Sequence, residues 1–281
     1  MGWIQSIGCG VLVCLQVALS ALPLVERRSS EVDVIGLSAL LGVPQGSDLV
    51  TYTQTHWLRT AGKERWEMGE LGSEQRAVVL SWADSHGIYA TWGPSETRYD
   101  AALVFGASTG IMRARLDYLI ELWNRGIRFD QVVFLVGERP LSEAVDDLFG
   151  ICPNEAVAAS YLASTTNFPL EMRKLPVLFV SVPMKITQEG KKIRPTTGDT
   201  LHAWLKEKSP QQKKVLFVSN QPFNGYQYAV TEGVLPEEIL FEVVGPGIKD
   251  PAQHPLAATI TLDSLARWLY QERQNQRSEA P

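Results

Sequence analysis

The sequence predicts an α/β protein with a doubly wound, mainly parallel five-stranded sheet, helices on both faces (Rossmann-like) and an N-terminal helical lead-in. The first observation is a set of five apolar runs, each as long as a strand and too continuous to face water on either side. They lie at residues 101–105, 131–136, 177–182, 215–219 and 239–244. The second observation is that helical patterns alternate with these runs, at residues 111–125, 154–163, 199–208, 222–232 and 262–272. Such alternation is typical of strand-helix-strand units wound right-handed around one parallel sheet.

Length and composition limit the classes of protein to which the chain can belong. A chain of 281 residues, 45% hydrophobic and 20% charged, is long enough for one large domain with N-terminal additions. Its net charge of -5, with no clustered basic run, offers no surface for nucleic acid, so we expect no nucleic-acid partner. Cys152 stands alone in the body of the chain, so neither a disulfide framework nor a zinc cluster can be assembled there.

The N-terminus is the most hydrophobic part of the chain. Residues 1–25 carry no charged side chain, and residues 7–25 form an apolar run that we expect to contact a membrane. Three interpretations remain open: a cleaved secretory signal, a membrane anchor or a buried core helix. If the segment spans, Arg27 and Arg28 would keep the following domain in the cytoplasm by the positive-inside rule. The topology is therefore open.

Four parts follow from these patterns. We expect a membrane anchor or signal segment over residues 1–25, a helical lead-in packed on the core over 26–100, a ligand-binding α/β domain over 101–270 and a flexible tail over 271–281. In the lead-in, Ser73 is expected to cap a helix that runs to about His86. The tryptophans of this region are expected to pack in the core rather than to form a sugar or lipid platform. They are Trp57, Trp66, Trp82 and Trp92.

The first strand of the domain ends in a turn of small and hydroxyl residues directly before a helix. Backbone N–H groups at a helix N-terminus favour an anion, so this turn is the central candidate for ligand binding. Its candidate residues are Gly106, Ser108, Thr109 and Gly110. Arg113 and Arg115 follow in the first helical turns, where a cation opposes the helix dipole and needs an anionic partner. For both arginines, that partner is either the ligand or a carboxylate of the chain.

The other candidates follow other strands, because loops at the carboxyl ends of parallel strands share one edge of the sheet. Glu138 is expected to accept hydrogen bonds from a ribose and Arg139 to hold a phosphate, with an ion pair between the two as the alternative. Glu155 and Asp199, at helix starts, are the candidate catalytic bases, with helix capping as the alternative. The candidate ligand-binding residues are completed by Thr197, Ser219 and Asn220.

Several enzyme classes lack their motifs. The chain has no Gly-x4-Gly-Lys-Ser/Thr phosphate loop, no His-Glu-x-x-His zinc pair and no Gly-x-Ser-x-Gly nucleophile turn. The turn at 106–111 looks like the cofactor turn of short-chain dehydrogenases, but Met112 replaces the last glycine. No tyrosine has a lysine four residues later, so the acid of that hydride-transfer reaction is missing. An atypical NAD(P)-binding protein of that type is therefore a further alternative.

Taken in order, these loops resemble the SanA/YdcF-like family of bacterial envelope-associated proteins, over about residues 101–247. The matching pieces are the strand and turn at 103–110, the arginine-bearing helix, and the stretches at 132–137, 155–156, 196–200 and 214–220. Residues 223–226 stand where the family typically carries a histidine and an arginine, and Gly137-Glu138 replaces its Gly-Gly step. The resemblance implies a doubly wound fold, often behind a membrane segment, with a cleft for a nucleotide-like or phosphate-bearing ligand.

We therefore expect a membrane-tethered or exported domain that binds a small anionic, nucleotide-like ligand and acts in cell-envelope maintenance, on the periplasmic side. One branch of the family is associated with S-adenosylmethionine, so this compound or another nucleotide is the candidate cofactor. A transfer or hydrolysis reaction would use Glu155 or Asp199 as base. The alternative is a non-enzymatic envelope or host-interaction protein that has kept the fold, as the missing histidine and arginine suggest. The sequence leaves the ligand and the oligomeric state open.

Overall fold

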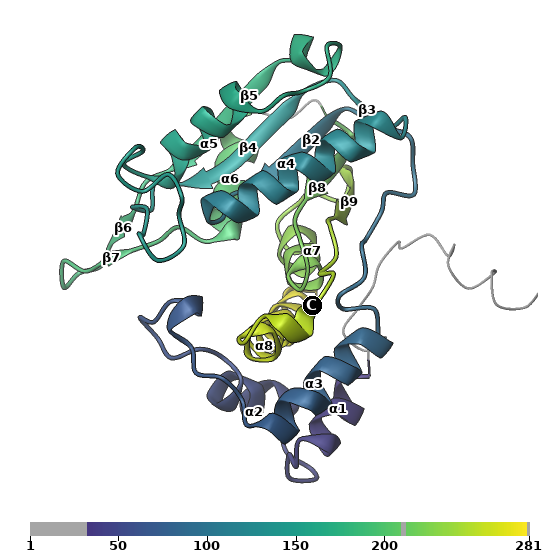
Figure 1. Cartoon of the computed structure of the whole chain (residues 1–281), viewed down its shortest axis with the longest axis vertical. Coiled ribbons are helices and arrows are strands. Elements are labelled where there is room, and N and C mark those ends of the chain that lie inside the picture. The colour runs from purple at the N-terminus through teal and green to yellow at the C-terminus, as the bar shows by residue number, and fades with distance from the viewer. Residues whose placement is uncertain (1–32, 209–211, 280–281) are drawn as a thin grey trace, which may run out of the picture.

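The computed structural model describes residues 33–208 and 212–279 and confirms the predicted α/β class. Five parallel strands form the central sheet in the order β5-β4-β2-β8-β9 (Figure 1). They are β2 (Ala101–Phe105), β4 (Val132–Gly137), β5 (Val177–Val182), β8 (Lys214–Val218) and β9 (Leu240–Val244). Each lies within one residue of its predicted bounds.

The strand order fixes where a ligand site can form. The chain runs from β2 outward to β4 and β5, then returns to the other side of β2 for β8 and β9. The order therefore reverses between β2 and β8, whose following loops leave the sheet in opposite directions. In open parallel sheets such a reversal leaves a crevice at the carboxyl ends of the two strands. Here the crevice lies between the loop that begins at Gly106 and the loop that begins at Ser219.

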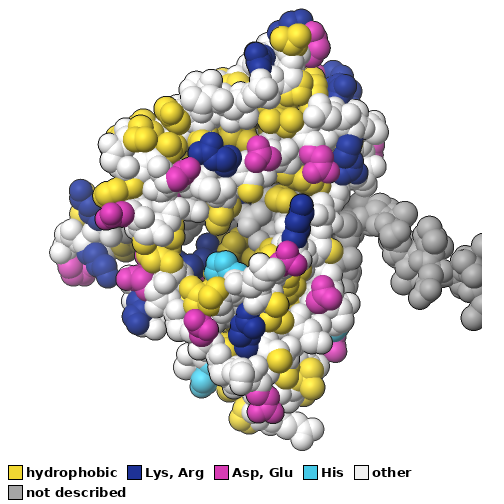
Figure 2. Space-filling model, viewed as in Figure 1, with side chains coloured by type: hydrophobic (Ala, Val, Ile, Leu, Met, Phe, Trp, Pro, Cys, Tyr) yellow, Lys and Arg dark blue, Asp and Glu magenta, His cyan; other side chains and the backbone are white. Residues whose placement is uncertain are grey.

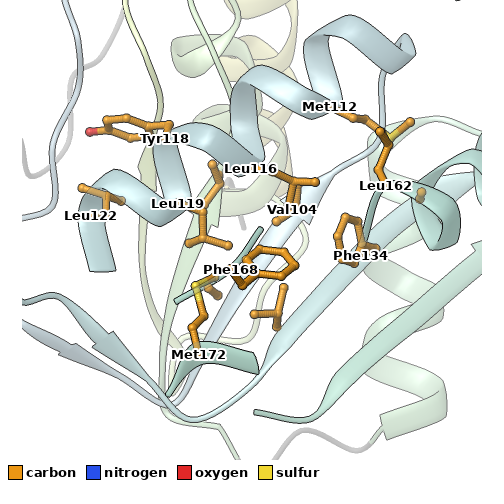
Figure 3. Packing of buried hydrophobic residues seen from close by; sticks show 14 of the residues in the cluster. Val104, Met112, Leu116, Tyr118, Leu119, Leu122, Phe134, Leu162, Phe168 and Met172 are labelled. Atoms are coloured by element: carbon orange, nitrogen blue, oxygen red, sulfur yellow. The ribbon is translucent and has the colours of Figure 1, made fainter. Parts of the chain in front are cut away.

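Helices cover both faces of the sheet and explain why the strands read as continuous apolar runs. On one face, α4 (Thr109–Asn124) and α5 (Glu155–Thr165) pack Leu116 and Leu162 against Val104 and Phe134 (Figure 3). On the other face, Trp204 of α6 (Thr197–Lys208) packs with strand residues that point the opposite way, and α7 (Asn224–Glu232) joins this cluster. Full burial fails at the two edge strands, since Val177 and Phe179 of β5 and Leu240 of β9 are each more than a third exposed.

The lead-in folds mainly against the last helix. Helices α1 (Val34–Leu40), α2 (Leu49–His56) and α3 (Ser73–Ser85), with the 3-10 turn η2 (Arg65–Glu67), adjoin α8 (Ala257–Glu279) in the lower part of Figure 1. Trp57, Trp82 and Trp92 are buried there with Trp268 of α8, which confirms the predicted core role of these three lead-in tryptophans. Gln54 Nε2 also donates to the carbonyl of Ala266, at 2.7 Å.

Two helix boundaries differ from those predicted. Helix α3 begins at Ser73, but Gly72 occupies the capping position and the Ser73 hydroxyl makes no capping bond. Helix α8 continues through the polar residues that we expected to form a flexible tail, as far as Glu279. The reason is tertiary contact, since Asn275 is buried and its amide donates to the carbonyl of Ala229 at 2.8 Å.

Shorter elements complete the described chain. They are β1 (Arg98–Tyr99), β3 (Arg128–Phe129), the hairpin β6 (Lys185–Ile186) and β7 (Lys192–Ile193), and the 3-10 turns η3 (Met172–Lys174) and η4 (Pro251–Gln253). In residues 33–208 and 212–279, no helix is both long and apolar enough to cross a bilayer. The apolar run at 7–25 lies outside the described residues.

Candidate functional site

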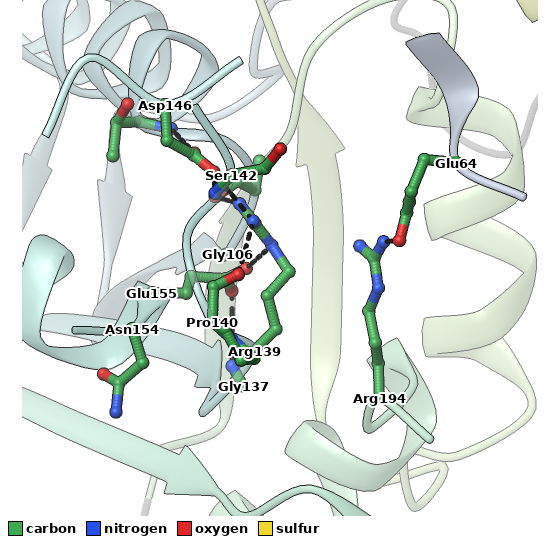
Figure 4. Close-up of polar contacts among 12 residues, drawn as sticks. Glu64, Gly106, Gly137, Arg139, Pro140, Ser142, Asp146, Asn154, Glu155 and Arg194 are labelled. Atoms are coloured by element: carbon green, nitrogen blue, oxygen red, sulfur yellow. Dashed lines mark hydrogen bonds and ion pairs between the residues drawn. The ribbon is translucent and has the colours of Figure 1, made fainter. Parts of the chain in front are cut away.

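The loops at the carboxyl ends of β2 and β4 are joined by a buried group of charges, which we call the Arg139 network: Arg139, Asp146 and Glu155. The guanidinium of Arg139 contacts both acids, with Nε 2.9 Å from Glu155 Oε2 and Nη1 2.9 Å from Asp146 Oδ2. Its Nη2 donates to Asp146 Oδ1 at 3.1 Å and to the carbonyl of Ala107 at 3.2 Å. All three side chains are at least nine-tenths buried, so the network is a structural tie between the two loops (Figure 4).

The glycine turn after β2 therefore receives an anion from the chain itself. The backbone N–H of Thr109 donates to Asp146 Oδ1 at 2.9 Å, which is the type of contact that we predicted for a ligand. The Thr109 hydroxyl accepts from the N–H of Asp147, and Arg113 forms an exposed ion pair with Asp147 at 2.9 Å. Of the two partners considered for Arg113, the structure has the carboxylate. Thr109, Arg113 and Arg139 are thus engaged within the protein, because the 142–147 turn folds over the loop.

Glu155 reaches the sheet edge as expected, but it has lost the freedom that a general base needs. Its Oε2 pairs with Arg139 and its Oε1 accepts from the N–H of Gly137 at 3.2 Å. Burial raises the pKa of Glu155, while the charges of Arg139 and Arg115 act in the opposite direction. A side chain at Gly106 would collide with Glu155, so this glycine makes room for the carboxylate. The residue that caps α5 is Asn154, whose side-chain amide oxygen Oδ1 accepts from Val157 N at 2.9 Å.

Asp199 also has a structural role. Thr196 caps α6, because its hydroxyl accepts from the backbone N–H of Asp199 at 3.3 Å. In turn, Asp199 Oδ2 accepts from the backbone N–H of Thr196 at 2.7 Å, so the two residues form a reciprocal capping pair. Helix capping was the alternative role expected for Asp199, but Asp199 lies inside the first turn of α6, as does the predicted ligand-binding residue Thr197. Lys185 of the β6–β7 hairpin pairs with Asp199 at 2.7 Å, and hydrogen bonds with Lys185 and Thr196 lower the pKa of Asp199 despite partial burial. The two predicted bases are thus each committed to local structure.

Four other predicted residues occupy different surroundings. Glu138 does not pair with Arg139: it is exposed, and its Oε1 accepts from the Ser181 hydroxyl on β5 at 3.2 Å. Ser108 precedes α4 without a side-chain capping bond, and Gly110 has open space around it. Ser219 is completely buried, and within the described part of the chain its hydroxyl has no hydrogen-bond partner.

Asn220 is the predicted residue that the structure places directly at the crevice, where it binds Arg115. Arg115 Nε and Nη2 donate to Asn220 Oδ1 at 3.1 and 2.7 Å, and Nη1 donates to the carbonyls of Phe105 and Gly106. Arg115 thus spans the loops after β2 and β8. All these acceptors are neutral, and the side chain is buried. Burial lowers the pKa of Arg115 to about 9, which means that its charged form is poorly stabilised there.

A second group of cations lies near this crevice, with two members from the lead-in and two from the predicted α/β domain. We call it the arginine cluster; its members are Arg59, Arg65, Arg194 and Arg267. Figure 2 shows a hollow between the α/β part and the N-terminal helices, with Lys or Arg side chains inside it. Burial lowers the pKa of Arg65 to about 10, and the charges of Arg267 and Arg59 lower it further despite Asp263. Arg65 also stacks on the Phe223 ring, 4.1 Å from its centroid.

Two acids partly balance the arginine cluster. Asp263 is held by Arg267 through contacts of 3.0 and 3.1 Å, while its contact with Arg65 is longer, 3.4 Å. Glu64 pairs closely with Arg194, and its other oxygen lies 3.8 Å from Arg59 (Figure 4). The cluster therefore has four positive charges against two negative ones, with 22% to 35% of each guanidinium side chain exposed.

None of the four arginines of the cluster was among the predicted site residues. Arg59 and Arg65 lie in the lead-in and Arg267 in α8, so neither strand order nor loop position pointed to them. Arg194 directly precedes the loop residues predicted at the start of α6. The sequence did contain one signal of a site for anions at this edge of the sheet. Arg115 lies near a helix N-terminus, where the helix dipole disfavours a cation without a negatively charged partner.

A separate pocket of about 360 Å³ lies at the opposite end of the sheet, between the starts of β4 and β5 and the 164–173 segment. Its one arginine, Arg173, is already held by the carbonyl of Phe168 at 2.6 Å and by Asn167. Ligand sites in open parallel sheets form at the carboxyl ends of the strands, so we place the candidate site at the arginine cluster and not in this pocket. Comparison of the chain with protein-family models, curated proteins and solved structures finds no match.

Proposed function

We propose that this chain is a binding protein for a small anionic, nucleotide-like ligand, which it holds in the cleft between the sheet edge and the lead-in. The observation that carries the proposal is the surplus positive charge at the cleft, where four arginines of the cluster share two acids and the buried Arg115 lies close by with neutral hydrogen-bond acceptors. An isolated buried or half-buried cation costs free energy that an anion recovers on binding. Arg65 offers its guanidinium to the cleft, and Arg115 adds positive potential from behind Asn220.

The charge also favours one class of nucleotide. A phosphate-bearing nucleotide carries negative charge that would balance the positive charge of Arg65 and Arg115. Guanidinium groups also bind phosphate through paired hydrogen bonds. S-adenosylmethionine carries a positive sulfonium, which the same arginines would repel. We therefore propose a nucleoside phosphate rather than S-adenosylmethionine. Binding without transfer or hydrolysis is favoured because both predicted bases, Glu155 and Asp199, are engaged by the chain.

Thermal unfolding of the full chain tests the proposal. At a ligand concentration one hundred times Kd, we expect AMP or ADP to stabilise the protein by about 2.7 kcal/mol, or about 5–10 °C in Tm. Arg65→Gln should remove most of the shift. Arg98→Gln should keep it, because Arg98 forms an exposed pair with Asp130 away from the cleft. The proposal fails if neither nucleotide raises Tm, or if the two variants respond alike.

The cellular placement that we propose, anchored in or exported across a membrane, depends on residues 1–25. These residues lie outside the described part of the chain. Fractionation of a C-terminally tagged full chain, with N-terminal sequencing, distinguishes an anchor from a cleaved signal. An intact N-terminus in the soluble fraction would contradict both.

A further inference from the structure

The position of Glu64 indicates that the cleft has a second anion site, which the chain fills with its own carboxylate. Glu64 lies on the lead-in, directly before η2, while Arg194 lies on the loop that leads into α6. Their ion pair therefore joins the two walls of the cleft, well apart from the Arg139 network, as Figure 4 shows. One carboxylate oxygen contacts Arg194, and the other faces Arg59 at 3.8 Å.

The contact with Arg59 is only partly satisfied. Within the described residues, Glu64 Oε2 is buried and has no hydrogen-bond partner. Burial lowers the pKa of Arg59 and of Arg194, and the charges of Arg267 and Arg59 respectively lower them further. One carboxylate thus lies between two arginines and is in close contact only with Arg194, while Glu64 also forms the capping box of η2 with Glu67. A group with more negative charge and more acceptor oxygens would satisfy both guanidinium groups better.

Glu64 is also next to the residue on which the proposed function rests. Glu64 and Arg65 are consecutive in the chain, and Arg59 and Arg65 both contact Asp263: the backbone N–H of Arg59 donates to its Oδ1 at 3.1 Å, and Arg65 Nε lies 3.4 Å from its Oδ2. We therefore expect a short ligand with two linked anionic groups to reach Arg65 with one group and the pair Arg59 and Arg194 with the other. A single phosphate can engage only one of these places.

We propose that Arg59 and Arg194 form a second anion subsite, that Glu64 occupies it in the free protein, and that the ligand is a pyrophosphate compound whose second phosphate displaces Glu64. The proposal rests on the proposed function and names its ligand class, a nucleoside diphosphate or related pyrophosphate. Glu64 acts in it as a built-in competitor. Removing its negative charge should therefore strengthen binding, whereas loss of a merely structural ion pair would not.

Calorimetric titration with inorganic phosphate and inorganic pyrophosphate tests this directly. The wild-type chain should bind pyrophosphate more tightly than phosphate. Glu64→Gln should tighten pyrophosphate binding about tenfold, equivalent to about 1.4 kcal/mol. Glu70→Gln, which removes one negative charge from an exposed position of the same segment, should change it less than about twofold. Unchanged or weaker pyrophosphate binding by Glu64→Gln would overturn the proposal.

Arg194→Gln provides a second measurement that does not depend on the folding of the Glu64 variant. It should abolish the preference for pyrophosphate over phosphate and leave phosphate binding nearly unchanged, because Arg65 is intact. If Arg194→Gln retains the preference, the second subsite is refuted while the proposed function stands. If the wild-type chain binds neither anion and neither nucleotide raises its Tm, the proposed function itself fails.

Discussion

Two groups of arginine side chains lie at the same edge of the sheet and differ in how their charge is balanced. In the Arg139 network one buried guanidinium faces two buried carboxylates, and backbone groups of Thr109, Ser142 and Gly137 complete the hydrogen bonding of those acids. In the arginine cluster four half-exposed guanidinium groups share Asp263 and Glu64. The first arrangement is complete without a ligand. The second has surplus positive charge, and for this reason we propose that it is the side of the cleft that receives an anion.

The largest expected effect comes from breaking the balanced group. Arg139→Ala leaves Asp146 and Glu155 buried without their cation, so we expect a loss of about 3–5 kcal/mol in the free energy of unfolding. Arg113→Ala is the matched control, because it removes an exposed ion pair to the adjacent Asp147 and should cost less than about 1 kcal/mol. Urea unfolding measures both. Equal losses would show that the Arg139 network is not the tie that we describe.

A second comparison uses the two ends of the glycine turn. Gly106→Ala places a methyl group against Glu155 and the carbonyl of Leu135, and overpacking of this kind costs about 1–3 kcal/mol. Gly110→Ala has open space and lies in the first turn of α4, so it should be neutral or stabilise by up to about 1 kcal/mol. Thermal unfolding of both variants checks the difference. A neutral Gly106→Ala would contradict the close approach of Glu155.

Acid should weaken the balanced group in a defined pH range. Burial alone would raise the pKa of Asp146, but hydrogen bonds from Arg139 and from the N–H groups of Ser142 and Thr109 lower it. A lowered folded-state pKa contributes stability that is fully present above the ordinary value of about 3.9 and is lost as the pH falls through the lowered one. We therefore expect the stability advantage of the wild type over Arg139→Ala to shrink below about pH 4. An advantage that stays constant down to pH 2 would contradict this assignment.

The smallest effect on stability is expected in the arginine cluster. Arg59→Gln removes a charge that is repelled by neighbouring cations and whose nearest carboxylate oxygen, on Glu64, is a weak partner at 3.8 Å. The free energy of unfolding should therefore change by less than about 1 kcal/mol. The same variant should weaken pyrophosphate binding. Chemical denaturation and titration of one protein preparation measure both quantities. A large loss of stability would place Arg59 with the structural charges instead.

The fold could be predicted from the sequence because its signals are local. Each buried strand is a short apolar run, and it was found within one residue. The four helices predicted between the strands were found within about two residues, whereas the last helix, predicted over 262–272, extends over 257–279. The loop residues were placed at the correct edge for the same reason. Their partners could not be predicted. Asp146 lies in an aperiodic stretch and reaches Thr109 and Arg139 only through the folding of the 137–154 loop.

The arginine cluster depends on even more distant contacts. Arg65 contacts Asp263, which lies 198 residues further along the chain, and no pattern within either segment predicts this contact. Arg113 and Arg115 both lie near the N-terminus of α4, where the helix dipole disfavours a cation, so both were expected to have an anionic partner. Arg113 pairs with the carboxylate of Asp147, whereas Arg115 donates to neutral acceptors. A charge that is locally unfavourable can thus mark either a structural pair or a ligand site, and only the tertiary partner separates the two.

The packing of α8 against the lead-in has a consequence for synthesis of the chain. Gln54 meets Ala266, 212 residues later, and Trp82 shares a core with Trp268. During translation the lead-in emerges first but cannot bury its tryptophans until the last helix has left the ribosome. Its apolar surface therefore stays uncovered while the whole sheet is synthesised. A chain released before α8 is made would keep that surface exposed and be prone to aggregation. The arginine cluster needs Arg267 of α8, so a chain truncated before α8 cannot assemble the whole cluster.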